Sequence, residues 1–153
     1  LPLVLAGPPN SPLVAGQTVS LTTALQLPLV LPSHHLGIRP VINDAAARMQ
    51  TKLNLSFEAD SSRLIGELVA SGMGYTMLPA CYLTKEMTRE VTREVAQEAA
   101  EGRLQTWPIA KPSLALDIFL ASRKNSKISG RQFSEVEVAI ADLALGILSA
   151  AEH

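Results

Sequence analysis

The 153-residue sequence contains a single cysteine, Cys81, and few charged or aromatic side chains. One cysteine cannot form an internal disulfide, so a disulfide framework is excluded and a reducing, cytoplasmic compartment is favoured. Lysine and arginine number 13 against 14 aspartates and glutamates. The formal net charge of -1 therefore leaves no basic footprint for nucleic acid in this chain. No apolar run approaches the roughly 18 residues that a membrane-spanning helix needs.

Charge is scarce as well as balanced. Charged residues make up 18% of the chain, below the usual ~25%, and the mean hydropathy is +0.20. Both values indicate that much of the surface is buried against something else. The chain begins at Leu1 with an apolar run, without a start methionine or a signal-peptide pattern. We therefore expect a piece of a longer protein that begins inside a strand.

Residues 27–79 carry the pattern around which the chain is organised. Apolar or alternating runs at 27–31, 53–57 and 75–79 predict three strands. A helix is expected to begin near residues 36–39, because Pro40 is tolerated only in a first turn. A second helix is expected from Asp60 or Ser61. Strands that alternate with helices are typical of a parallel sheet covered by helices.

The ends and faces of these two helices can also be predicted. Ser33 is a candidate cap for the approach to the first helix. Gly72 fits a left-handed cap at the end of the second helix. The expected buried stripe of that second helix consists of Leu64, Ile65, Leu68 and Val69.

Further elements are predicted on both sides of this unit. Strands are expected at 1–7, 103–109 and 114–122, one helical turn at 22–25, and helices at 85–100 and about 133–147. Trp107 is expected to serve packing. We expect the strands at 1–7 and 114–121 to lack neighbours. Such edges would pack against another copy or against missing parts of a longer chain.

Open α/β sheets bind ligands at the carboxyl ends of their strands, which directs attention to the corners at Ser33, Asp60 and Pro79. Free N–H groups at the start of the first helix would favour an anion near Ser33 by ~0.3–1 kcal/mol when exposed. Asp60 and Ser61 are in the first place helix caps. His34 is in the first place an exposed turn histidine.

No catalytic or cofactor motif is present. Ser33 lies in no Gly-x-Ser-x-Gly elbow, which argues against a hydrolase nucleophile. His34 and its neighbouring histidine lack a third metal ligand at suitable spacing. The Gly-Met-Gly sequence that ends at Gly74 lacks the third glycine and the preceding strand of a dinucleotide fingerprint. We therefore expect no metal, no cofactor and no enzyme activity; binding without turnover fits better.

Several segments, read in order, resemble the effector-binding domain of LysR-type transcriptional regulators. They are 27–39 (Leu-Pro-Leu-Val-Leu-Pro-Ser-His-His-Leu-Gly-Ile-Arg), 57–61 (Phe-Glu-Ala-Asp-Ser) and 69–79 (Val-Ala-Ser-Gly-Met-Gly-Tyr-Thr-Met-Leu-Pro). The segment 3–12 resembles the approach to the second subdomain of that family, and 102–109 with 114–122 resembles its close. The likeness covers nearly the whole chain. It is nearest to the branch that includes regulators of nitrogen assimilation.

The resemblance implies an α/β fold like that of type II periplasmic binding proteins, with a parallel or mixed sheet and helices on both faces. Residues 18–111 would form a complete effector subdomain II. Residues 1–17 and 112–153 would be a remnant of subdomain I with the crossover strands.

The resemblance also implies a ligand-sensing regulatory domain. A small metabolite, expected to be anionic, would bind in the cleft between the subdomains and control DNA binding and transcription. The effector-binding residues would be Ser33, His34, Asp60, Ser61, Gly74 and Tyr75. A homo-oligomer is implied, with DNA bound only through an N-terminal helix-turn-helix outside this chain, and with no membrane partner. The alternatives are a transport-type solute-binding protein and a fragment of an α/β enzyme. The full-length N-terminus would test the first, through a signal peptide or lipid anchor, and a turnover screen on the longer protein would test the second. A helix-turn-helix upstream would favour the regulator over both.

Overall fold

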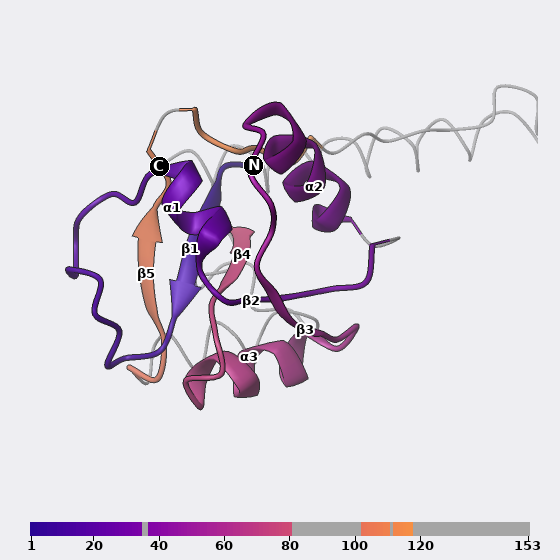
Figure 1. Cartoon of the computed structure of the whole chain (residues 1–153). Coiled ribbons are helices and arrows are strands. Elements are labelled where there is room, and N and C mark those ends of the chain that lie inside the picture. The colour runs from indigo at the N-terminus through magenta and orange to yellow at the C-terminus, as the bar shows by residue number, and fades with distance from the viewer. Residues whose placement is uncertain (35–36, 81–101, 111, 118–153) are drawn as a thin grey trace, which may run out of the picture.

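The computed structural model describes residues 1–34, 37–80, 102–110 and 112–117 (Figure 1). The predicted helices at 85–100 and 133–147, Cys81, and the predicted strand beyond residue 117 lie outside these ranges. The elements within them are β1 (Leu3–Gly7), α1 (Leu21–Gln26), β2 (Leu29–Leu31), α2 (Ile38–Arg48), β3 (Leu55–Glu58), α3 (Ser62–Ala70), β4 (Thr76–Pro79) and β5 (Gln105–Pro108).

The predicted alternation of strands and helices over residues 27–79 is confirmed. α2 begins at Ile38 and places Pro40 in its first turn, where a missing N–H costs nothing. α3 ends in a Schellman motif. Gly72, at φ 81°, donates its N–H to the Val69 carbonyl, and Met73 donates to that of Leu68. A short helix, α1, forms where one turn was expected, and Ser20 caps it by accepting from the Thr23 N–H.

The strands form a three-stranded sheet and a two-stranded sheet, which a bridge joins edge to edge into one mixed array. β2 and β3 pair in parallel, and β1 lies between β4 and β5, antiparallel to both. A parallel bridge between Leu29 and Tyr75 joins β2 to the start of β4. The resulting order is β3-β2-β4-β1-β5. The expectation that the strand at 1–7 lacks neighbours was wrong, because β4 and β5 return from later in the chain to pair with both of its edges.

Helices cover both faces of this sheet, as predicted (Figure 1). Leu5, Leu29 and Met77 point to the face that carries α1 and α2. Val30 and Leu78, one residue out of phase, point to the face that carries α3. Alternate side chains of one strand thus enter two separate cores, which is why these strands are apolar on both faces.

Two features of burial differ from what the sequence pattern suggests. Leu64, expected in the buried stripe of α3, is 46% exposed, while Val69 is fully buried and Gly66 is buried as well. The buried side of α3 is therefore centred on Gly66 and Val69 rather than on Leu64. All four residues of β3 are exposed, and the only partner of this edge strand in the described chain is β2.

The loop after β1 is held by buried aromatic residues. Trp107 is fully buried, and its indole N–H donates to the Val14 carbonyl oxygen at 3.0 Å. The Tyr75 and Ser11 hydroxyls lie 2.8 Å apart, and the two aromatic rings pack at a centroid distance of 6.1 Å. The expected packing role of Trp107 is confirmed. In the described part of the chain, no helix is long and apolar enough to cross a membrane.

Candidate functional site

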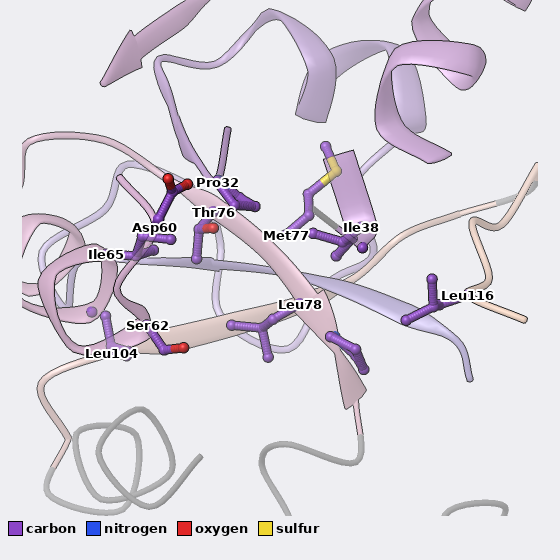
Figure 2. A pocket seen from close by; sticks show the side chains of 13 residues that line it. Pro32, Ile38, Asp60, Ser62, Ile65, Thr76, Met77, Leu78, Leu104 and Leu116 are labelled. Carbon is purple, nitrogen blue, oxygen red and sulfur yellow. The ribbon is translucent and has the colours of Figure 1, made fainter. Parts of the chain in front are cut away.

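A cavity of about 260 Å³ lies at the carboxyl ends of β2, β3 and β4 (Figure 2). This is the end of the sheet at which the sequence predicted a ligand. Met77 and Ile38 border it on the α2 side of β4, and Ile65 borders it on the α3 side. The cavity therefore wraps around the end of β4. The lining is completed by Pro32, Gly37, Asp60, Ser62, Gly66, Thr76, Leu78, Pro79, Leu104 and Leu116.

Three of the lining side chains are polar. Thr76 is 4% exposed, and no hydrogen-bond partner of its hydroxyl lies among the residues that the structure describes. Asp60 and Ser62 belong to the corner between β3 and α3 and are exposed. Figure 2 shows Thr76 on the same side of β4 as Asp60 and Ile65. The cavity thus combines apolar walls with a few polar atoms, as small-molecule sites do.

The structure brings two of the predicted site residues together. The Ser33 backbone N–H donates to Oδ1 of Asp60 at 2.9 Å, which joins the corner after β2 to the corner after β3. The candidate role of Ser33 as the cap of α2 is wrong. The N-cap is Gly37 (φ 27°, ψ -90°), which has no side-chain cap bond. Asp60 lines the cavity, whereas Ser33 is not among its lining residues.

Ser61 and His34 lie close by in the chain but do not line the cavity. Ser61 is the N-cap of α3 and accepts from the Leu64 N–H at 3.4 Å, so its expected capping role is confirmed. His34 is exposed in the turn that precedes α2.

Gly74 and Tyr75 directly precede β4 and are not among the residues that line the cavity, whose lining begins one residue later at Thr76. The Tyr75 N–H donates to the Pro28 carbonyl oxygen at 2.8 Å, at the amino end of β2. A Cβ atom on Gly74 would lie 2.6 Å from that same carbonyl oxygen, so glycine is required there for strand pairing. The structure therefore does not bring Gly74 and Tyr75 together with Asp60.

Two residues that the sequence reasoning missed organise the site. Arg39 is 7% exposed and binds Glu58 and the Pro32 carbonyl oxygen, so it fixes α2 to the ends of β2 and β3. A signal was present, since Arg39 precedes the buried Ile42 by three residues and therefore lies on the inner face of α2. The second is Thr76, a buried residue whose hydroxyl belongs to an otherwise apolar strand. No group of three potential metal-ligating side chains occurs in the described ranges.

Comparison with known proteins identifies the class to which this fold and cavity belong. The sequence model of the LysR substrate binding domain family matches residues 1–132. The chain therefore belongs to this family.

Among curated proteins, the chain is 36% identical over 76 residues to the HTH-type transcriptional regulator BbuR of Bordetella bronchiseptica. The match covers 50% of this chain and 23% of the relative, so the chain corresponds to only part of such a regulator.

Solved structures show the same fold. The Synechocystis CcmR regulatory domain in complex with 2-PG has a TM-score of 0.59 at 20% identity, covering 91% of this chain and 62% of that one. The effector binding domain of QuiR in complex with shikimate has a TM-score of 0.56 at 16% identity, covering 79% and 54%. A Corynebacterium glutamicum OxyR C206 mutant has a TM-score of 0.59 at 18% identity, covering 99% and 44%. These likenesses establish the type II periplasmic-binding-protein-like fold.

Proposed function

We propose that this chain is the effector-sensing part of a LysR-type transcriptional regulator and that a small molecule binds in the cavity at the ends of β2, β3 and β4. One observation carries the proposal: in a chain of this family, the cavity lies at the carboxyl ends of parallel strands. That is the edge at which open α/β sheets bind ligands.

The size of the cavity and the ligands of similar domains support a small metabolite. A dry cavity of about 150 Å³ holds a benzene molecule. At about 260 Å³, this cavity accommodates a somewhat larger compound. Shikimate and 2-PG, the molecules bound to the QuiR and CcmR domains, are small compounds of this kind.

The remaining parts of the regulator follow from the family. We infer that DNA is bound by an N-terminal helix-turn-helix in the rest of the protein, that the protein is a cytoplasmic homo-oligomer, and that the effector is bound without turnover. Residues 18–111 would form subdomain II, and 1–17 with 112–153 would belong to subdomain I. The effector can shift the regulator between two states only by its differential affinity for them.

A bulky substitution in the cavity tests the proposal. Ser62 lines the cavity in the first turn of α3, and Ser62→Trp would fill it from an exposed position that tolerates a large side chain. Arg63→Trp places the same side chain one residue further, outside the cavity lining. Chromatin occupancy of the tagged full-length protein identifies its promoters. Transcription from them is then followed across growth conditions in wild type and both variants.

We expect Ser62→Trp to remain bound to DNA but to lose the response of transcription to growth conditions. Arg63→Trp should respond as wild type does. A Ser62→Trp protein that is folded and responds normally would show that the cavity is not the sensing site.

A further inference from the structure

The residues that line the cavity contribute a negative charge and no positive charge within the described part of the chain. Asp60 is its only ionisable lining residue within the described chain, and no lysine, arginine or histidine of that part lines it. The Ser33 N–H, a donor that could have met an anion at this corner, already donates to Asp60. A ligand anion here would displace that carboxylate or lie beside it, and like charges repel. The wall therefore favours a ligand that donates hydrogen bonds over the anion expected from the helix terminus.

Thr76 supplies a second, independent indication. Thr76 is 4% exposed and lines the cavity, and its hydroxyl has no partner among the described residues. Buried hydroxyl groups are nearly always hydrogen-bonded, because an unmet one carries the full cost of its desolvation. A polar group of a ligand in the cavity would meet that need.

We propose that the cavity binds a small molecule with an apolar body and a hydrogen-bond-donating end: an ammonium group, which donates to Asp60 and to the Thr76 hydroxyl oxygen, or a hydroxyl group, which donates to Asp60 and accepts from the Thr76 hydroxyl. The inference rests on the proposed function and names the ligand class of the same cavity. Ile65, Met77 and Leu78 supply the apolar contact.

The acceptors have the capacity for this. A carboxylate has about four lone-pair sites, so Asp60 can hold the Ser33 N–H together with a further partner and still accept from a ligand. A threonine hydroxyl can accept through either of its two lone pairs. An ammonium group would add charge attraction to Asp60, whereas a hydroxyl group would gain the hydrogen bonds alone.

The ligand class is tested with two sets of probes, and within each set an amine, an alcohol and a carboxylate share a matched carbon skeleton. One set is cyclohexylmethylamine, cyclohexylmethanol and cyclohexanecarboxylate, and the other is hexylamine, hexanol and hexanoate. The compounds of each set are compared in thermal-shift titrations of the full-length protein at constant ionic strength. We expect the amine or the alcohol of a set to raise the melting temperature at concentrations at which the carboxylate does not. A response to the amines alone would identify an ammonium ligand, and a response to the alcohols alone a hydroxyl ligand.

Three variants locate the contact. Thr76→Val and Asp60→Asn keep the shape of each side chain, and the amide oxygen that Asp60→Asn introduces can still accept from the Ser33 N–H. Each is expected to weaken the responding probe about tenfold, the effect of losing one hydrogen bond of about 1.4 kcal/mol. Thr106→Val makes the same change on β5 outside the cavity lining and should leave the affinity unchanged.

Two results would overturn the inference. The first is a response to the carboxylates only; if Ser62→Trp removes that response, the cavity still binds ligands and the proposed function stands. The second is a panel without any response, or a response that Thr76→Val and Asp60→Asn leave intact. The transcription test of Ser62→Trp then decides the proposed function separately.

Discussion

The guanidinium of Arg39 and the carboxylate of Glu58 form an ion pair at 3.0 Å across the carboxyl ends of β2 and β3. The same Nη1 atom donates to the Pro32 carbonyl oxygen at 2.8 Å, and Nε donates to Oδ1 of Asn43 at 3.1 Å. The Arg39 side chain is 9% exposed, whereas that of Glu58 is 44% exposed. The arginine therefore holds the first turn of α2 against the two strand ends that border the cavity.

Removing this arginine should cost more than removing its partner's charge. Arg39→Met keeps the buried volume but leaves the Pro32 carbonyl without its donor and Glu58 without its cation. We expect a loss of about 1–3 kcal/mol in the free energy of unfolding. Glu58→Gln removes only a half-exposed charge and should cost about 0–1 kcal/mol. Equilibrium urea unfolding of the two variants measures the difference; equal losses would mean that the arginine contributes only through the ion pair.

The Thr76 hydroxyl has no hydrogen-bond partner among the described residues, which predicts that a substitution in the site stabilises the protein. Thr76→Val replaces the hydroxyl with a methyl group of similar size and removes the desolvation cost of a buried polar group. We expect a gain of about 1 kcal/mol in the absence of ligand. Thr106→Val, on the partly exposed strand β5, serves as the control and should change stability by less than about 0.5 kcal/mol. A destabilised Thr76→Val protein would show that the hydroxyl is satisfied.

Two glycines separated by one residue should respond very differently to alanine. A Cβ on Gly74 would lie 2.6 Å from the Pro28 carbonyl oxygen and 3.2 Å from Val30, so β2 and β4 would have to separate. We expect Gly74→Ala to cost about 1–3 kcal/mol or more. Gly72→Ala meets nothing within 4 Å, and only its φ of 81° opposes alanine, at about 1 kcal/mol. Thermal melts of both variants test this order; the reverse order would refute the close approach of the strands.

The cap of α3 can be separated from the residue that follows it. Ser61→Ala removes the oxygen that accepts from the Leu64 N–H. Because that bond is 3.4 Å long, we expect a loss near the lower end of the usual range, about 0.5–1 kcal/mol. Ser62→Ala changes the next serine, which is not the N-cap, and should be nearly neutral. Urea unfolding of both proteins provides the comparison, and equal stabilities would assign the capping elsewhere.

The order and the ends of the elements could be predicted because they depend on neighbours in the sequence. The position of Pro40 located the start of α2, and Gly72 located the end of α3, since each restricts the backbone within a few residues. The direction of the strands predicted the edge of the sheet at which a ligand would bind, and the cavity lies at that edge.

Most of the misses concern contacts between distant parts of the chain. The periodicity of α3 did not show that Leu64 would be exposed and Gly66 buried. The alternation of β3 did not show that it would lie exposed at an edge. The pairing of β1 with β4 and β5 joins segments about 70 and 100 residues apart, and no local pattern encodes such a register.

The sequence by itself determined that strands and helices alternate, where the helices begin and end, and to which family the chain is similar. These properties depend on side-chain periodicity and on the backbone restrictions of proline and glycine. Only the tertiary structure decided that Asp60 and Thr76 line one cavity, that Gly74 and Tyr75 are absent from its lining, and that Arg39 is buried. Those outcomes depend on strand order and packing, which bring together residues that are far apart in the sequence and that no local pattern connects.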